Sequence, residues 1–351
     1  MIPAAFEYVR ADSADAAIAA LVEHGDEAKL LADRHSLLPL MKLRLAAPSV
    51  LVDIGRLQEL SYVRDGGDHV AIGGLTRYSD LETSGLLGTE APLVRHAAGQ
   101  VGDPQVRHRG TIGGSIAHGD PASDLPAVLL ALRATLVAQG PDGERTIPVD
   151  DFFTGFLETA LAPTELLTEI RVPKAAGAGW SFQKFNRRAQ DWAIVGVALV
   201  RNGSTGIGLV NMASRPLRAS ATEAAADGGA SAVDAAAVAD EGTEPSADLN
   251  ASVEFRRHLA RVLTRRALEA AESRGSGVGS GAMDLAFTAW RSPRSTTSGW
   301  PWLTRSTWPT RGWPRRSSSP CASSGRCCWK GRRGSARPRW PWPSLAGPAA
   351  S

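Results

Sequence analysis

The stretch that most constrains this chain is Thr111-Ile112-Gly113-Gly114-Ser115, which stands shortly before Asp120-Pro121-Ala122-Ser123-Asp124-Leu125-Pro126 and an apolar run that ends at Leu132. Paired glycines allow positive φ angles and a close approach of the backbone to another group, and successive backbone N–H groups can then bind an anion. The pattern predicts a phosphate-binding loop followed by an apolar helix. An ordinary turn is the alternative, because glycine pairs also punctuate loops.

Neither Gly-x-Gly-x-x-Gly nor Gly-x-x-x-x-Gly-Lys-Ser/Thr occurs in the chain, which excludes the best-understood dinucleotide and mononucleotide signatures. The N-terminal segment instead predicts helix 13–24, capped by Ser13 and stopped by Gly25, then strand 29–31, an apolar helix and strand 50–54. This alternation of strand and helix is typical of a small parallel sheet.

The middle of the chain carries the turn signals of a mixed α+β sheet domain. Its turns are marked by Asp65-Gly66-Gly67-Asp68 and by Pro141-Asp142-Gly143. The elements that we expect there are strands 60–64, 69–73, 134–138, 145–149 and 166–172 and helices 78–84 and 91–100.

The sequence after about residue 176 predicts a second, smaller set of strands and helices. The expected elements are strands 180–185, 193–201 and 206–212 and Ala-rich helices within 219–250. A last helix is indicated by an apolar stripe at helical spacing, Phe255, Leu259, Val262 and Leu263. The arginines outside this stripe are expected on its solvated face, and they are Arg256, Arg257, Arg261 and Arg265.

Several separated segments together resemble one known family. They are residues 29–53, Asp103-Pro104-Gln105-Val106-Arg107, Arg109 to Ser115, Asp191-Trp192-Ala193 and the basic helix after residue 250. From about residue 2 to about residue 275, the chain is similar to the FAD-binding medium subunits of the aerobic carbon monoxide dehydrogenase and xanthine dehydrogenase family, the molybdenum hydroxylases.

This resemblance implies an α+β fold. A two-part FAD-binding domain of the PCMH (vanillyl-alcohol-oxidase-like) type would be followed by a smaller α+β C-terminal domain with a three-stranded antiparallel sheet and helices. Residues 1–55 would form the first FAD-binding subdomain, with a βαβ arrangement, residues 56–175 the second, and residues 176–280 the C-terminal domain.

The resemblance also implies which residues bind FAD. In the family, two loops are expected to hold the FAD diphosphate, while a carboxylate, a lysine and an aromatic residue contact the rest of the cofactor. The matching positions here are Ala32, His35 and Ser36 in the first loop, Thr111, Ile112, Gly113, Gly114 and Ser115 in the second, and then Asp124, Lys184 and Trp192. Asp124 would accept hydrogen bonds from ribityl or ribose hydroxyl groups.

Four of these residues also have a purely structural interpretation, which the sequence leaves open. Ser36 can cap the helix that follows it, and Asp124 can be an acid in a first helical turn. Lys184 can lie on the solvated side of an edge strand, and Trp192 can either lie against the flavin ring or pack in the core.

The first loop departs from the family pattern. The family has Ala-Gly-Gly-His/Gln-Ser, whereas this chain has Ala32-Asp33-Arg34-His35-Ser36, so both glycines are replaced. Side chains restrict the positive φ angles that glycine adopts, and the Asp33 carboxylate would repel a phosphate. A family member that has lost FAD and serves as a scaffold is therefore an alternative function.

By resemblance, the chain is an FAD-dependent oxidoreductase subunit that takes electrons from an iron–sulfur small subunit and passes them through FAD to a quinone, NAD or oxygen. Molybdopterin and 2Fe-2S clusters would reside only in partner subunits, and a molybdopterin large subunit would complete a heterotrimer that can dimerise. The sequence shows no catalytic side-chain arrangement and no metal-ligand spacing, so the flavin would carry the redox chemistry.

Composition changes abruptly in the C-terminal tail. Residues 285–351 contain eleven Arg, one Lys, eight Trp and all three Cys but no Asp or Glu, which leaves residues 1–284 with a net charge of −9. We interpret this tail as disordered, out-of-frame sequence; a nucleic-acid-binding arm is the alternative, because arginine and aromatic residues bind phosphates and bases.

Residues 1–284 contain no cysteine, no signal pattern and no apolar run of membrane-spanning length, and these features predict a cytoplasmic protein.

Overall fold

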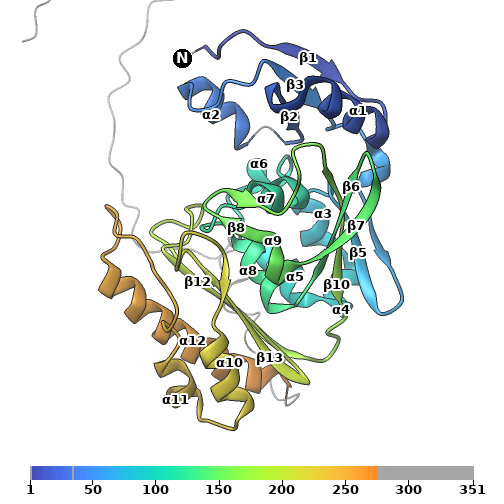
Figure 1. Ribbon diagram of the computed structural model, residues 1–351. Helices are drawn as coiled ribbons and strands as arrows, with labels where there is room; N and C mark the ends of the chain where they lie inside the picture. The colour runs from blue at the N-terminus through green and yellow to red at the C-terminus, as the bar shows by residue number, and fades with distance from the viewer. Residues whose placement is uncertain (1, 34, 276–351) are drawn as a thin grey trace, which may run out of the picture. The chain divides into compact units, whose positions relative to one another are not determined.

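The computed structural model describes residues 2–33 and 35–275, which form three β-sheets, a small hairpin and the helices around them (Figure 1). Arg34 and the tail of residues 285–351 lie outside the described residues. Within the described part, no helix has the length and hydropathy needed to cross a bilayer.

The N-terminal part is a three-stranded parallel sheet in the order β1-β3-β2, which confirms the predicted parallel arrangement. Ser13 caps the first helix by accepting a hydrogen bond from the Ala16 N–H, and Gly25 ends it with a φ of 54°. The sequence does not indicate β1, which is four residues long and mostly exposed. The elements are β1 (Glu7–Arg10), α1 (Ala14–His24), η1 (Gly25–Glu27), β2 (Ala28–Leu31), α2 (Leu37–Leu43) and β3 (Val50–Asp53).

The middle part is built on a five-stranded antiparallel sheet in the order β4-β5-β10-β6-β7. Both predicted hairpins are present, and β10 lies between them. The strands are β4 (Val63–Asp65), β5 (His69–Gly73), β6 (Thr135–Gly140), β7 (Gly143–Pro148) and β10 (Leu166–Pro173), with β8 (Phe153–Gly155) and β9 (Glu158–Thr159) in a separate hairpin.

Short helices pack around this sheet. They are η2 (Gln58–Leu60), α3 (Tyr78–Thr83), α4 (Gly85–Glu90), α5 (Pro92–Ala98), α6 (Pro104–Arg107), α7 (Ile112–His118), α8 (Asp124–Ala131) and α9 (Val149–Phe152). Every residue of α8 is buried, as expected for a helix that is apolar on all sides. This helix therefore carries its first residue, Asp124, into the protein interior.

The C-terminal part is a four-stranded antiparallel sheet in the order β11-β12-β13-β14. The three expected strands are confirmed, and β14 is too short, at two residues, to leave a sequence pattern. Helices α10 to α12 accompany this sheet, with α12 against β11 and β12. The elements are β11 (Gly179–Phe185), β12 (Val195–Asn202), β13 (Ser204–Val210), β14 (Leu217–Arg218), α10 (Ser220–Asp227), α11 (Ala232–Ala237) and α12 (Val253–Gly275).

Strand β12 divides two hydrophobic cores, because successive side chains of a strand point to opposite faces. Ala198 and Val200 belong to the core that contains α8, whereas Val197 and Leu199 belong to the core beneath α12. The middle and C-terminal parts therefore share one continuous apolar core on the α8 side of this sheet.

Helix α8 lies directly on β13 because two glycines of the strand have no side chain. A Cβ atom on Gly206 would be 2.0 Å from the Ala131 carbonyl oxygen, and one on Gly208 would be 1.9 Å from the Ala127 carbonyl oxygen. These distances are far below van der Waals contact, so the approach of the two backbones requires glycine at both positions.

One part of the predicted pattern in the last helix is wrong. Arg256, expected on the solvated face, is 1% exposed, and it donates hydrogen bonds to Asp248 Oδ2 at 2.7 Å and to the Ile194 carbonyl oxygen. Phe255, expected in the apolar stripe, is 41% exposed and packs edge-on against Phe185. The guanidinium can face inward because these acceptors compensate much of the cost of its burial, while its Nε has no hydrogen-bond partner among the described residues.

Candidate functional site

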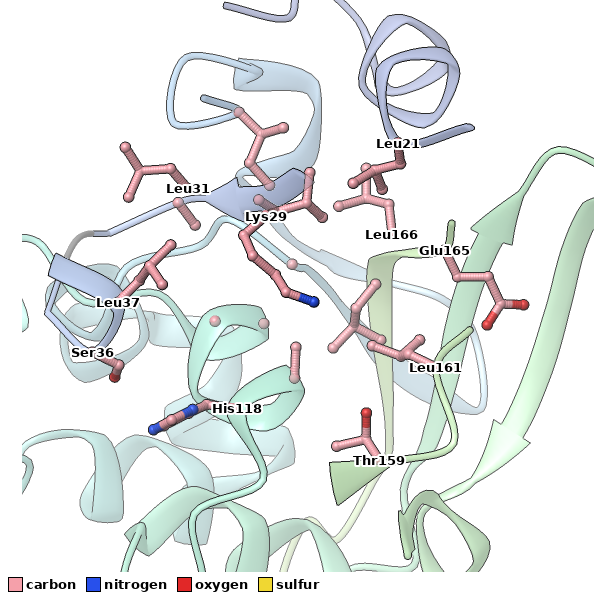
Figure 2. Close-up of a pocket in the computed structure, with 18 of the residues that line it drawn as sticks. Leu21, Lys29, Leu31, Ser36, Leu37, His118, Thr159, Leu161, Glu165 and Leu166 are labelled. Atoms are coloured by element: carbon pink, nitrogen blue, oxygen red, sulfur yellow. The ribbon is translucent and has the colours of Figure 1, made fainter. Parts of the chain in front are cut away.

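Three cavities open around Ala32, Asp33, His35 and Ser36, which we call the Asp33 loop. The apolar cavity, of about 360 Å³, is lined by residues of the N-terminal sheet, α7 and β10 (Figure 2). The Asp124 cavity, of about 270 Å³, is lined by most of the polar residues that the resemblance implies. The arginine cavity, of about 300 Å³, is lined by three arginines among other residues.

The Thr111–Ser115 segment is the start of helix α7 and not the loop that the sequence predicts. Thr111 is the N-cap residue, and its Oγ1 accepts a hydrogen bond from the Gly114 N–H at 3.3 Å. The N–H groups of Ile112 and Gly113 donate to carbonyl oxygens in the turn after β5. This first turn is therefore held rigidly against the middle sheet.

The two glycines of this turn serve close packing and not positive φ, because both have the negative φ of a helical turn. A Cβ atom on Gly113 would be 2.4 Å from the Gly74 carbonyl oxygen, and one on Gly114 would be 2.8 Å from Thr111 Oγ1. Both glycines line the apolar cavity. Ile112 instead packs in the core, is fully buried and lines none of the three cavities.

The Asp33 loop lies beside this helical turn. Asp33 Oδ1 accepts a hydrogen bond from the His35 N–H at 3.1 Å, and Oδ2 accepts one from the Thr111 N–H at 3.3 Å. Ser36 stands at the predicted N-cap position of α2, but its side chain makes no capping hydrogen bond. Ala32, His35 and Ser36 each line at least one cavity.

A buried ion pair forms one wall of the Asp124 cavity. Lys184 Nζ lies 2.6 Å from Asp124 Oδ2, with the two side chains 5% and 6% exposed, and it also donates to the Gln100 carbonyl oxygen at 3.1 Å. Lys184 is on β11, which is an edge strand, yet its side chain is not solvated. The pair joins two segments that the sequence places far apart.

The second carboxylate oxygen of Asp124 has no partner. Oδ1 is buried and has no hydrogen-bond partner among the described residues. Burial raises the pKa of Asp124, and the neighbouring Lys184 ammonium opposes this shift only in part. Because a buried acceptor without a donor costs free energy, this oxygen is suited to a donor that enters the cavity.

Two aromatic residues complete the Asp124 cavity. Trp192 is 59% exposed, which contradicts the core-packing interpretation, and it offers a flat apolar surface to an aromatic ligand. Tyr78 is buried and hydrogen-bonded with the Ser115 side chain, and its burial raises the pKa of its hydroxyl group. Ser115 is thus fixed in position by a neighbour that the sequence does not identify.

The sequence interpretation also missed Lys29 of β2. Figure 2 shows its side chain pointing from the strand toward the middle of the apolar cavity, where most of the labelled neighbours are aliphatic. A charged residue between apolar ones in the Ala28–Leu31 strand is the signal that marks this position. The arginine cavity adds further positive charge through Arg56, Arg77 and Arg109. These four cations line two of the three cavities at the Asp33 loop, together with the carboxylates Asp53 and Glu165, and their positive charge attracts anions.

Two family models match the chain. One, described as the FAD binding domain in molybdopterin dehydrogenase, matches residues 4–175, and the other, the CO dehydrogenase flavoprotein C-terminal domain, matches residues 180–271. Asp124 falls within the first model, and Lys184 and Trp192 fall within the second. The Asp124 cavity is therefore built by both domains.

Similar proteins cover the same region. The carbon monoxide dehydrogenase medium chain of Hydrogenophaga pseudoflava is 42% identical over 285 residues, which span 78% of this chain and 99% of the relative. The 6-hydroxypseudooxynicotine dehydrogenase complex subunit alpha of Paenarthrobacter nicotinovorans is 37% identical over 280 residues, which span 76% of this chain and 95% of that relative.

A solved structure agrees with these matches. Carbon monoxide dehydrogenase from Hydrogenophaga pseudoflava, in a form that lacks the Mo-pyranopterin moiety of the molybdenum cofactor, superposes with a TM-score of 0.75 at 45% identity, over 78% of this chain and 99% of that chain. Sequence and fold thus agree with the resemblance seen in the motifs. This chain belongs to the family of FAD-binding medium subunits of carbon monoxide dehydrogenase and xanthine dehydrogenase type oxidoreductases.

Proposed function

We propose that this chain holds FAD between the Asp33 loop, the first turn of α7 and the Asp124 cavity, and that it passes electrons from an iron–sulfur subunit through the flavin to an external acceptor. In this proposal it works in a cytoplasmic heterotrimer, with that small subunit and a molybdopterin large subunit. The names of its relatives support this proposal, since they are a medium chain and a complex subunit of dehydrogenases.

The observation that carries the proposal is the unpartnered Oδ1 of Asp124. A ribityl hydroxyl group is a donor of the kind that this buried carboxylate oxygen lacks, and a charge-assisted hydrogen bond would compensate its desolvation. The exposed indole of Trp192 in the same cavity suits a flat ring. The residues at this end of the site therefore fit a flavin.

The diphosphate end would use the first turn of α7. Gly113 and Gly114 leave no side chain between the backbone of this turn and the apolar cavity, and Lys29 supplies a positive charge there. The Thr111 N–H would donate to a phosphate oxygen once it is released from Asp33. This end fits FAD only after that carboxylate moves.

The bound flavin would supply the redox chemistry, and the chain contributes binding, orientation and electrostatics. The ammonium group of Lys184 lies beside Asp124 in the wall of the cavity, and its positive charge would favour negative charge that develops nearby. Asp124 in turn holds the ammonium group in position.

A scaffold without cofactor is the second candidate, and the Asp33 carboxylate on the Thr111 N–H favours it. The visible absorption spectrum of the purified full chain, with the released cofactor identified after denaturation, separates the two. A flavin spectrum supports electron transfer, and its reduction should then require the partner subunits. A chain that takes up no flavin even in excess FAD would leave the scaffold function.

Replacement of Asp124 by alanine is expected to weaken FAD binding by about tenfold or more, because the hydroxyl acceptor is lost. Asp124→Asn should lose less, since the amide oxygen still accepts a hydrogen bond. Isothermal titration of the flavin-free chain measures both dissociation constants. The exposed residue Asp151 provides the control, and Asp151→Ala should bind FAD as the natural sequence does. Equal affinities for Asp124→Ala and the control would contradict this role.

A further inference from the structure

Asp33 is the residue that the walls of the apolar, Asp124 and arginine cavities have in common. A flavin dinucleotide has its negative charges in the middle, between two ring systems. A ligand of this kind that extends across two of the cavities has to pass the Asp33 loop. The position of the Asp33 side chain therefore determines whether one ligand can occupy two of these cavities at once.

The Asp33 carboxylate binds the two loops in the way that a phosphate would. Oδ1 accepts from the His35 N–H of its own loop and Oδ2 from the Thr111 N–H of the other, at 3.1 and 3.3 Å. It also lies against the first turn of α7, since a Cβ atom on Gly114 would be 3.5 Å from Oδ2. Carboxylate and phosphate oxygens are both anionic acceptors, so they compete for the same backbone donors.

Few other donors of this turn remain for a ligand. The N–H groups of Ile112 and Gly113 donate to main-chain carbonyl oxygens, and the N–H of Gly114 donates to Thr111 Oγ1. The Thr111 N–H is therefore the donor of this turn that can bind an anion from outside the turn. In this structure it donates to the Asp33 carboxylate. A phosphate that keeps its distance from the carboxylate would forfeit this donor.

The obstacle is charge and not backbone strain. The non-glycine residues with positive φ among the described residues are Arg44, Arg133, Leu157 and Asn211, so Asp33 adopts its conformation without the penalty that a side chain would pay in the left-handed region. The loss of the family's glycine at this position therefore costs little conformational freedom in the observed state. A negative charge has been added instead.

We infer that Asp33 is a built-in competitor of the FAD diphosphate: its carboxylate occupies the Thr111 and His35 N–H groups in the flavin-free chain and has to leave them when the cofactor binds. This inference rests on the proposed FAD site, and it implies that the Asp33 carboxylate lowers the affinity of the chain for FAD. Two anions cannot share one N–H donor at contact distance without strong repulsion, because the protein surroundings screen charge less than water does.

Asp33→Asn tests this competition, since the amide keeps the size and an acceptor oxygen but removes the charge. FAD dissociation constants of the full, flavin-free chain are measured by quenching of flavin fluorescence. We expect Asp33→Asn to bind FAD at least about tenfold more tightly than the natural sequence. Asp33→Gly should bind at least as tightly as Asp33→Asn. Asp26→Asn, at an exposed acid of the same subdomain, makes the same change in net charge and should leave the affinity unchanged.

A second readout replaces FAD by inorganic pyrophosphate, and the melting temperature of each flavin-free variant is followed as pyrophosphate is added. Pyrophosphate should raise the melting temperature of Asp33→Asn and Asp33→Gly more than that of the natural sequence and of Asp26→Asn, because a ligand stabilises the state that it binds.

The outcomes separate the competition from the site. If the natural chain binds FAD and Asp33→Asn binds it no more tightly, Asp33 is not a competitor, although the FAD site stands. If no variant binds FAD but Asp33→Asn gains stability from pyrophosphate and the natural chain does not, the competition stands and the proposed function fails. If no variant binds FAD and pyrophosphate raises the melting temperatures of the natural chain and the three variants equally, both the competition and the proposed function fail.

Discussion

Lys184→Met is expected to lower the free energy of unfolding by about 3–5 kcal/mol at neutral pH, because it leaves the buried Asp124 carboxylate without its counter-ion. Methionine keeps the length and the apolar stem of the lysine side chain, so the loss comes from charge and hydrogen bonding. Urea denaturation of the full chain, followed by tryptophan fluorescence, measures the change. The same substitution should also weaken FAD binding, since Asp124 is then free to change its position.

The pH dependence of this loss follows from the carboxyl group that remains. Burial already raises the pKa of Asp124, and removal of the Lys184 ammonium takes away the cause that opposes this rise. The folded variant then binds a proton at a higher pH than the unfolded chain does, so stability is gained as the pH falls and lost as the pH rises through the folded pKa. The difference from the natural sequence should be smaller at about pH 5 than at about pH 8.

Two further variants test the explanation. Lys174→Met removes a surface ion pair with Asp65, whose side chain is 57% exposed, and should have a much smaller effect. The double variant Lys184→Met with Asp124→Leu removes both charges and should recover much of the stability that the single variant loses. A single variant no less stable than Lys174→Met would mean that the pair is solvated in solution.

Gly208→Ala is expected to destabilise the protein by about 3 kcal/mol, because the added Cβ atom would lie 1.9 Å from the Ala127 carbonyl oxygen. Backbone cannot rotate away as a side chain can, so α8 has to shift from β13. Since α8 begins at Asp124, the shift should also reduce FAD affinity. Urea denaturation and fluorescence titration measure the two effects.

Gly85→Ala is the matched control, because a Cβ atom on Gly85 meets nothing within 4 Å and this glycine has no positive φ. It stands in the first turn of α4, where alanine favours the helix by up to about 1 kcal/mol. The control should therefore be neutral or stabilising. Equal destabilisation by both substitutions would show that loss of glycine, and not contact with Ala127, is responsible.

Elements with local signals could be predicted from the sequence. Ser13 and Gly25 mark the ends of α1 because cap chemistry depends on a few neighbouring residues. The hairpins around Asp65-Gly66-Gly67-Asp68 and Pro141-Asp142-Gly143 follow from turn chemistry in the same way. The motif resemblance added the identity of the family, which the family models confirm.

Features that depend on distant partners could not be predicted. In the sequence, nothing distinguishes Arg256 from the other arginines of its helix. Its burial depends on Asp248 and on the carbonyl group of Ile194, 62 residues away. The contact of Asp33 with the Thr111 N–H joins residues 78 positions apart, so the sequence showed a missing glycine but not where the carboxylate lies. The sequence offers two roles for the glycine pair Gly113-Gly114, positive φ angles and a close approach of the backbone, and the structure shows the close approach without positive φ.

The ion pair and the shared core have a consequence for how such a chain can be inherited. The two family models meet between residues 175 and 180, yet Asp124 and Lys184 lie on opposite sides of this boundary, and Ala198 and Val200 pack in the core of α8. A recombination event at the boundary would join an Asp124 and a Lys184 that come from different parents. It would also bring together two parts of the core whose side chains come from different parents. We therefore expect a chain that joins these two domains from distant relatives to be less stable than either parent.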